Sequence, residues 1–188
     1  GLNLPVNRLA LDSKPDGPPI RQAALRLPGR FSNQVLYAVG DLPEAEEREP
    51  NDSNIKSEQI TLPVVINGRI GRPGDVDVFR FEGRANAEIV AEVYGRRLRS
   101  PVDSILWNDD AKQAEKPKHL YTGPGLLTHH ADACIRATLP ANGLYYLRME
   151  ETQGAGGDAY AYRLRVSPPR PDFQLRAAPS AINVRAGN

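Results

Sequence analysis

The residues of this chain that could carry chemistry are oxygen donors gathered in two short segments. The first segment places Glu47, Glu49 and Asn51 at alternate positions, with Asp52 beside them. An extended strand would point the three alternating side chains the same way, whereas a helix would scatter them. This spacing therefore predicts carboxylate and amide oxygens on one side of an extended chain.

The second segment adds Asp75 and Asp77 at the mouth of an expected β-strand. A calcium ion takes about six to eight oxygen ligands at flexible angles. Two segments that each supply hard oxygens therefore predict a calcium site between them. The expected ligands are Glu47, Glu49, Asn51, Asp52, Asp75 and Asp77.

The acidic stretch also has interpretations without a metal. Residues 41–52 hold six carboxylates against one arginine, which suits a solvated linker. Pro43 could also begin a short helix, with glutamates in its first turn and its end before Pro50. We hypothesise that the segment is helical without calcium and extended with it. Calorimetry and circular dichroism test this hypothesis, which fails if calcium gives neither heat nor stabilisation.

Other reactive residue types form weaker patterns. His129 and His130 are adjacent, with Asp132 and Cys134 nearby. Adjacent histidines of a strand point to opposite faces and rarely share a metal ion, so we expect surface or packing roles instead of a zinc site. The run 108–110, Asn-Asp-Asp, predicts a turn, with a second cation site or a structural Asx turn as the alternatives.

The sequence does not favour an enzyme or a nucleic-acid binder. It contains no Gly-x-Ser-x-Gly elbow and no His-Glu-x-x-His motif. Asp75 and Asp77 could flank a glycosidic bond, but only Trp107 is a free aromatic platform. A net charge of +1 gives no electrostatic footprint for nucleic acid. The arginines at 96, 97 and 99 lack interleaved aromatic residues, so we expect a solvated loop there.

The elements that would position these residues are short strands. Phe79 and Phe81 share one face of their strand, and Val78 and Arg80 share the other. Residues 87–94, 134–139 and 160–166 show the same two-residue alternation, and Gly and Pro residues lie between these segments. The pattern predicts an all-β fold, an antiparallel β-sandwich of jelly-roll-like character. The expected core includes Phe79, Phe81, Ile89, Val93, Trp107, Leu139, Tyr146, Tyr162 and Leu164.

The chain divides into three zones. Residues 1–45 contain two expected strands, 23–27 and 34–39; residues 46–168 form the sandwich; and residues 169–188 form a linker and the start of a following module. A composition of 40% hydrophobic and 25% charged residues suits a soluble globular protein, and one cysteine excludes an internal disulfide. No apolar run reaches the roughly eighteen residues of a membrane span. The chain starts with Gly, so we expect that an upstream targeting segment is missing.

Five motifs in order carry a resemblance to a known family. They are Glu-x-Glu-Pro-Asn-Asp at 47–52, Asp-x-Phe-x-Phe at 77–81, Asn-Asp-Asp at 108–110, Asn-Gly-x-Tyr-Tyr-x-x-Met at 142–149, and Tyr-x-Tyr-x-Leu-x-Val at 160–166. Together they resemble the bacterial pre-peptidase C-terminal domain, a small β-sandwich attached to secreted peptidases and other large exported proteins. The resemblance covers residues 46–168. It implies calcium ligation by the residues at 47, 49, 51, 52 and 77, with Asp75 a nearby candidate.

The chain departs from this family in two places. The stretch 112–131 is longer than the usual loop, and the exposed aromatic cluster of the collagen-binding members is not evident, so we do not expect collagen binding. The flanks, 1–45 and 172–188, resemble edges of neighbouring immunoglobulin-like modules.

Taken together, the sequence predicts a non-catalytic, calcium-binding accessory module of a larger secreted or cell-surface bacterial protein. Such a module would orient neighbouring domains or aid export. The alternative is a binding module for an extracellular polysaccharide or protein. The expected partners are the neighbouring domains of the same polypeptide and an extracellular polymer, with no nucleic acid and no membrane span.

Overall fold

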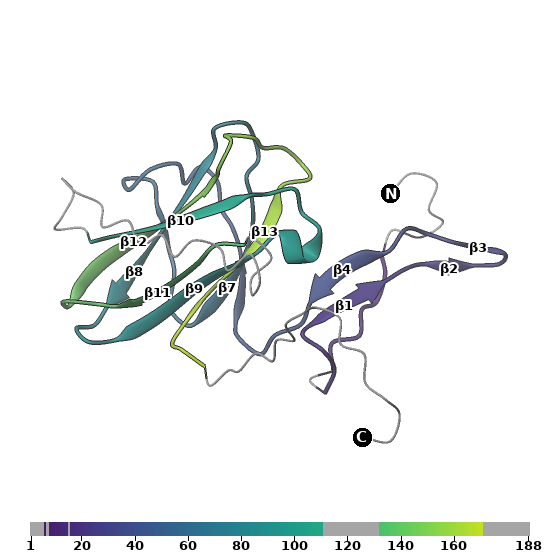
Figure 1. Ribbon diagram of the computed structural model, residues 1–188, viewed down its shortest axis with the longest axis horizontal. Coiled ribbons are helices and arrows are strands. Elements are labelled where there is room, and N and C mark those ends of the chain that lie inside the picture. Colours follow the sequence, from purple (N-terminus) through teal and green to yellow (C-terminus); the bar gives the residue numbers. More distant parts are fainter. Residues whose placement is uncertain (1–5, 7, 15, 111–131, 171–188) are drawn as a thin grey trace, which may run out of the picture.

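Figure 1 shows a computed structural model of the chain, a β-sandwich with an N-terminal arm beside it. The structure describes residues 6, 8–14, 16–110 and 132–170, and among these it describes the side chains of all but 107–110. The expectations for His129 and His130, for the loop 112–131 and for the segment 171–188 lie outside the described residues, as does the side chain of Trp107.

Nine strands form the two sheets of the sandwich. The four-stranded sheet has the order β10 (Ser104–Asp110), β12 (Gly143–Glu151), β8 (Val76–Gly83) and β6 (Glu58–Gln59). The five-stranded sheet has the order β11 (Cys134–Thr138), β9 (Glu88–Tyr94), β13 (Ala161–Ser167), β7 (Val64–Arg69) and β5 (Glu44–Glu46). The predicted all-β sandwich is confirmed. Its pairings are antiparallel except at two edges, where β5 runs parallel to β7 and β6 runs parallel to β8.

Alternation along the strands builds the core between the sheets. In β8, Phe79 and Phe81 point inward and are buried, and they pair with Leu147 and Tyr145 of β12. The rings of Phe81 and Tyr145 stack with their centroids 5.8 Å apart. Strands β9, β11 and β13 supply the facing layer. Buried residues that join this core include Ile66, Ile89, Ala91, Val93, Ile135, Leu139, Tyr162, Leu164 and Val166.

Two expectations about strand residues are wrong. Tyr146 is only half-buried, and its neighbour Tyr145 takes the core position instead. The Asn-Asp-Asp run at 108–110 is not a turn, because β10 continues through it and pairs with β12, Asn108 opposite Leu147. The other described core predictions, from Phe79 to Leu164, are confirmed.

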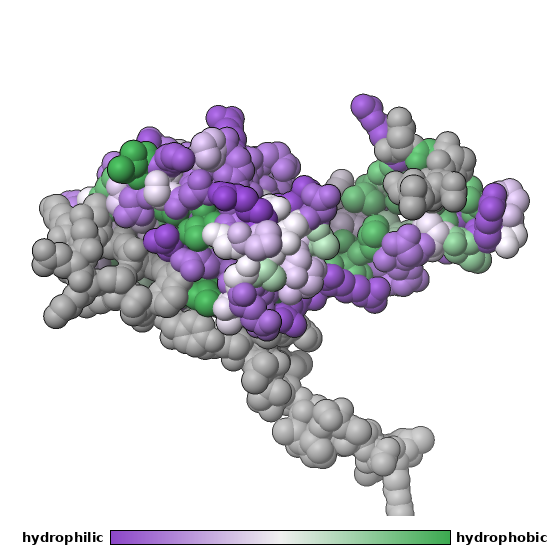
Figure 2. All heavy atoms as spheres, turned by 90° about the horizontal axis from the view of Figure 1, so that it is seen from above, coloured by the Kyte–Doolittle hydropathy of each residue, from purple (hydrophilic) through white to green (hydrophobic). Residues whose placement is uncertain are grey.

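The N-terminal arm has no core of its own. It consists of β1 (Ile20–Ala23) paired with β4 (Val35–Ala38), and β2 (Arg26–Leu27) paired with β3 (Arg30–Phe31). None of the described residues before Asn51 is buried. Figure 2 shows apolar side chains at the surface of the arm, whereas the sandwich beside it is mainly hydrophilic. The exposed apolar residues of the arm are Val6, Leu9, Leu11, Phe31 and Val35.

Helical structure within the described residues is limited to one 3-10 turn, η1 (Arg96–Leu98). No helix of the described part of the chain has the length and apolar character needed to cross a bilayer.

Candidate cation site

Three carboxylates converge where the acidic segment meets the sandwich. Glu47 follows β5, Glu49 lies two residues further on, and Asp77 is the second residue of β8. One carboxylate oxygen from each residue lies within 4.8 Å of the others. Asp77 is fully buried, Glu47 is half-buried and Glu49 is exposed. The cluster is therefore anchored in the sandwich and borders solvent at Glu49.

Backbone hydrogen bonds hold the acidic segment against the sheets. The Glu47 N–H donates to the carbonyl of Asn67 at 3.0 Å, which extends the pairing of β5 with β7 by one residue. The Val78 N–H donates to the carbonyl of Asn51 at 3.1 Å, which joins the other end of the segment to β8. The acidic segment thus lies along the start of β8, as the sequence predicted.

A glycine makes room for the cluster. A Cβ at Gly68 of β7 would lie 2.5 Å from the hydroxyl oxygen of Tyr162 and 2.8 Å from Oε2 of Glu47. That same Oε2 accepts a hydrogen bond of 2.7 Å from the backbone N–H of Arg69. Since any larger side chain at this position would push Glu47 and Tyr162 away, Gly68 is part of the site's construction.

Three buried oxygens at the site have no hydrogen-bond partner. Asp77 accepts a 2.6 Å hydrogen bond from the Tyr162 hydroxyl at Oδ2, but its Oδ1 has none. The amide of Asn51 donates to Oε1 of Glu47 at 3.0 Å, and its own Oδ1 is left without a donor. Oδ1 of Asp75 is the third. Buried polar atoms are nearly always satisfied in proteins, so these oxygens could accept an added donor or cation, although Oδ1 of Asp75 already lies 3.4 Å from the Arg72 guanidinium.

The electrostatics of the cluster favour the binding of a positive charge. Burial, together with a hydrogen bond to Glu47 and its negative charge, raises the pKa of Asp77 from 3.8 to about 10. Burial, with further repulsion from Asp75, Glu47 and Asp52, raises the pKa of Glu49 despite a hydrogen bond from the Asn51 N–H. A proton or a cation must therefore neutralise the cluster at neutral pH.

Burial also raises the pKa of Tyr162 well above 10, with the charges of Asp77 and Glu47 adding to the shift. Tyr162 therefore stays a hydrogen-bond donor to Asp77. Its ring packs into the core while its hydroxyl reaches the cluster, so the closing strand β13 takes part in the site as well as in packing.

The two remaining predicted ligands lie beside the converging set. Asp52 is engaged with cations: its Oδ1 is 2.8 Å from the Arg72 guanidinium, and its Oδ2 is 3.9 Å from the Lys56 ammonium. Asp75 is buried and accepts the Gly71 N–H at 2.7 Å, while its orphaned Oδ1 is 3.4 Å from Arg72. The structure thus brings Glu47, Glu49 and Asp77 together with Asn51. Asp75 lies beside this group, and Asp52 pairs with Arg72 instead.

A second acidic centre escaped the sequence reasoning. Asp132 is fully buried and accepts hydrogen bonds from the backbone N–H groups of residues 95–97. It also accepts one of 2.8 Å from Nε of Arg97. The guanidinium of Arg97 then contacts Glu92 at 2.8 Å and stacks 3.8 Å above the Tyr94 ring. The expectation of a solvated arginine loop is wrong at Arg97, because a buried acid holds it.

Cys134 lies next to this second centre and has no metal-binding geometry among the described residues. Burial, assisted by the charge of Glu92, raises its pKa to about 11. The side chain therefore remains a thiol at neutral pH, and thiolate is the form that attacks substrates or binds zinc.

Comparisons with known proteins give distant similarities. No family model matches the chain. A probable subtilase-type serine protease of Deinococcus radiodurans is 30% identical over 118 residues, which cover 61% of this chain and 15% of that protein. The chain therefore spans a small part of the length of this relative.

Two similar solved structures complete the comparisons. The pre-peptidase C-terminal domain of a collagenase from Bacillus anthracis is 16% identical, with 64% of this chain and 100% of that domain covered and a TM-score of 0.48. PliG of Salmonella Typhimurium, a periplasmic inhibitor of g-type lysozyme, is 14% identical. The match covers 66% of this chain and 96% of PliG, with a TM-score of 0.40. Likenesses of this size carry no functional information.

Proposed function

We propose that this chain is a non-catalytic accessory module of the pre-peptidase C-terminal type, and that it binds calcium at the site of Glu47, Glu49 and Asp77. The observation that carries the proposal is the convergence of these carboxylates beside three buried oxygens without partners. The five ordered motifs support the family assignment. The relative from Deinococcus radiodurans supports a place in a larger bacterial protein, because the chain covers only 15% of it.

The donor set fits calcium better than other common metals. The carboxylates of Glu47, Glu49 and Asp77 and the free amide oxygen of Asn51 are hard oxygen ligands, and Asp75 offers a further orphaned oxygen. Zinc prefers nitrogen and sulfur ligands, and the described cluster contains no histidine or cysteine. Magnesium demands a near-octahedral arrangement, whereas calcium accepts an irregular set of carboxylate and amide oxygens.

The ion would act as a staple without reactive chemistry. Its charge would replace the proton on Asp77 and satisfy the orphaned oxygens, so it would stabilise the folded state by binding it selectively. The ligands join the acidic segment to β8, and Glu47 and Asp77 are also linked through Tyr162 of β13. The staple would therefore fix the segment that leads from the N-terminal arm into the sandwich.

This position suggests the role of the module in a longer protein. A fixed connecting segment holds whatever precedes it at a constant angle to the sandwich, whereas a free acidic linker lets it turn. Calcium at roughly 10⁻⁴ to 10⁻³ M is met outside the cell, which fits a secreted or cell-surface protein. We therefore propose that, once the protein has bound calcium outside the cell, the module orients neighbouring domains or assists export.

Calcium-dependent melting tests the proposal. Asp77→Ala and Glu49→Ala should lower the melting temperature in calcium and leave it unchanged in chelator. Asp52→Asn is the matched control, because this acid belongs to the same segment but pairs with Arg72, and it should keep the calcium response. Equal losses with and without calcium in the first two variants would contradict the metal role.

A further inference from the structure

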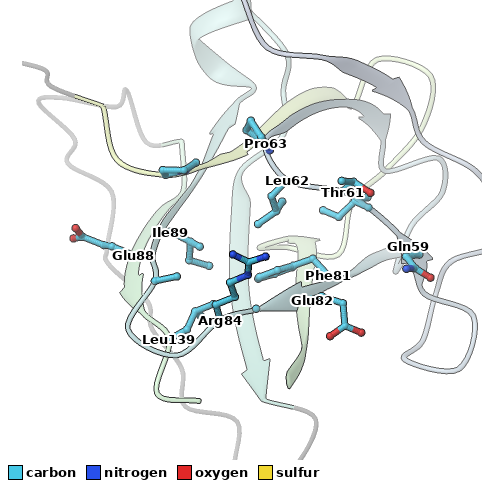
Figure 3. Close-up of a pocket in the computed structure, with 14 residues that line it drawn as sticks. Gln59, Thr61, Leu62, Pro63, Phe81, Glu82, Arg84, Glu88, Ile89 and Leu139 are labelled. Atoms are coloured by element: carbon cyan, nitrogen blue, oxygen red, sulfur yellow. The ribbon is translucent and has the colours of Figure 1, made fainter. Parts of the chain in front are cut away.

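A cavity of about 580 Å³ opens at the end of the sandwich that lies away from the cation site. Figure 3 shows its apolar lining, to which Leu62, Phe81, Ile89 and Leu139 contribute. Ligand sites typically occupy about 300–1,000 Å³ and combine an apolar lining with a few polar groups. Asp77 and Gly83 lie near opposite ends of β8, so at about 3.3 Å per residue the Gly83 end of the cavity lies roughly 20 Å from the cation cluster.

One cation stands over this cavity. The Arg84 guanidinium projects between Leu62, Ile89 and Phe81, as Figure 3 shows. Arg84 is exposed and has no ion pair or hydrogen bond with any side chain that the structure describes. The nearby carboxylates of Glu82 and Glu88 point away from the cavity, and that of Glu88 is bound by Arg136. The cavity therefore suits an occupant with an apolar group and a negative charge.

The rim of the cavity is also a free sheet edge. Strand β6 pairs with β8 only as far as Gln59, and the last hydrogen bond runs from the Ile60 N–H to the carbonyl of Arg80 at 2.9 Å. Backbone groups alternate along a strand, so those of Glu82 point to the same side as those of Arg80. No described residue pairs with Glu82 on this side. An unpaired N–H and C=O at an edge can accept another strand.

We propose that this end of the sandwich binds an extended peptide by strand addition at Glu82. The peptide backbone pairs with the free groups of Glu82, one apolar side chain enters the cavity, and an acidic side chain two residues along meets Arg84. Residues i and i+2 of a strand share a face, so one extended peptide can satisfy both requirements. Calcium binding at the other end of β8 is not needed for this interaction.

Nuclear magnetic resonance titration with a capped peptide tests the proposal. The probe is acetyl-Thr-Leu-Thr-Glu-Thr-amide, whose Leu and Glu lie two residues apart. We expect saturable shifts at the amides of Leu62, Glu82 and Ile89. Peptides with Ala in place of Leu, or Lys in place of Glu, should bind at least tenfold more weakly. In an extended peptide, alternate backbone N–H groups point to opposite sides, so only one set can pair with the edge of β8. Two peptides, each N-methylated on one of these sets, should therefore differ: one should lose binding and the other should keep it.

Charge reversal gives the sharpest version of the test. Arg84→Glu should weaken binding of the Glu peptide at least tenfold and strengthen binding of the Lys peptide. Arg30→Glu on the arm is the matched control, since Arg30 is also exposed, and it should change neither.

Three results would overturn the strand-addition proposal. They are no saturable shift with the Glu peptide, equal affinities of that peptide for Arg84→Glu and the parent chain, or binding of dodecanoate in the cavity without binding of the peptide. Asp77→Asn should leave peptide binding unchanged, so failure of this proposal and failure of the calcium site can be told apart.

Discussion

Two fully buried aspartates of this sandwich have opposite surroundings. The carboxylate of Asp132 is surrounded by donors, namely three backbone N–H groups and the Arg97 guanidinium. The carboxylate of Asp77 has the Tyr162 hydroxyl as its described donor, and Glu47 and Glu49 lie beside it. A buried charge requires a partner. The protein supplies that partner at Asp132, whereas at Asp77 it leaves the place for a proton or an added cation.

This contrast separates an acid that maintains the fold from the acids that we propose bind a cation. Asp132 joins the loop after β9 to the segment before β11, and Arg97 continues the network to Glu92. Removing it should harm the fold in every solution. Removing Asp77 should lower stability only when the cation is present. In the metal-free protein its removal should instead change how stability depends on pH.

The largest effect is expected from Asp132→Asn. This change removes the charge of a buried acid that pairs with a largely buried guanidinium, and breaking such a pair costs up to about 3–5 kcal/mol of unfolding free energy. Arg97 keeps its contact with Glu92, so the loss should stay below the top of that range. Urea denaturation should show the same loss in calcium and in chelator. Asp103→Asn is the control, because its ion pair with Arg96 is partly exposed and should contribute less than about 1 kcal/mol. If calcium restored the stability lost in Asp132→Asn, Asp132 would not be the calcium-independent acid that this comparison requires.

A smaller effect is expected from Gly68→Ala. The added methyl group would contact the hydroxyl of Tyr162 and Oε2 of Glu47, so both groups must shift. Overpacking of this kind costs about 1–3 kcal/mol, and the displaced carboxylate should also weaken calcium binding. Gly143→Ala is the control, because a Cβ there meets no atom within 4 Å. Calorimetry on both variants separates the loss of stability from the loss of calcium affinity. Unchanged calcium affinity in Gly68→Ala would remove Glu47 from the ligand set.

The pH dependence of stability should sharpen the contrast further. The pKa of Asp77 rises from 3.8 to about 10 on folding, so the folded, metal-free protein holds a proton that the unfolded chain releases. This contribution to stability is complete below about pH 4 and is lost as the pH rises toward about 10.

In the metal-free protein, melting temperatures should therefore be higher at about pH 5 than at about pH 9, and Asp77→Asn should flatten the difference. Calcium displaces the proton, so the gap between calcium and chelator should widen as the pH rises. A metal-free melting temperature that falls equally in Asp77→Asn would assign the pH dependence to other groups.

Much of the sandwich could be predicted because its strands alternate. Phe79 and Phe81 of β8, and Tyr162 and Leu164 of β13, lie where a period of two places them. The error at Tyr146 shows the limit of that argument. Tyr145 and Tyr146 are adjacent, so the alternating pattern allows either ring to point into the core. Only the pairing of Tyr145 opposite Phe81 shows that Tyr145 is the one that does.

The cation site could be predicted in part for a similar reason. Glu47, Glu49 and Asn51 alternate in sequence, so their convergence follows from an extended segment. The ion pair of Asp52 with Arg72 could not be predicted, because it depends on where a loop twenty residues away turns back. The pairing of Asp132 with Arg97 was missed on the same grounds: the residues are 35 apart in sequence and meet only because β9 and β11 are neighbours.

Terbium luminescence is the most direct measurement of the central claim. Terbium replaces calcium at oxygen sites and emits when a nearby tyrosine absorbs, and the Tyr162 hydroxyl is 2.6 Å from the Asp77 carboxylate. The account predicts sensitised emission that saturates at one ion per chain, is displaced by calcium and is lost in Asp77→Asn but kept in Asp52→Asn. Emission of equal strength in Asp77→Asn, or none in the parent chain, would contradict it.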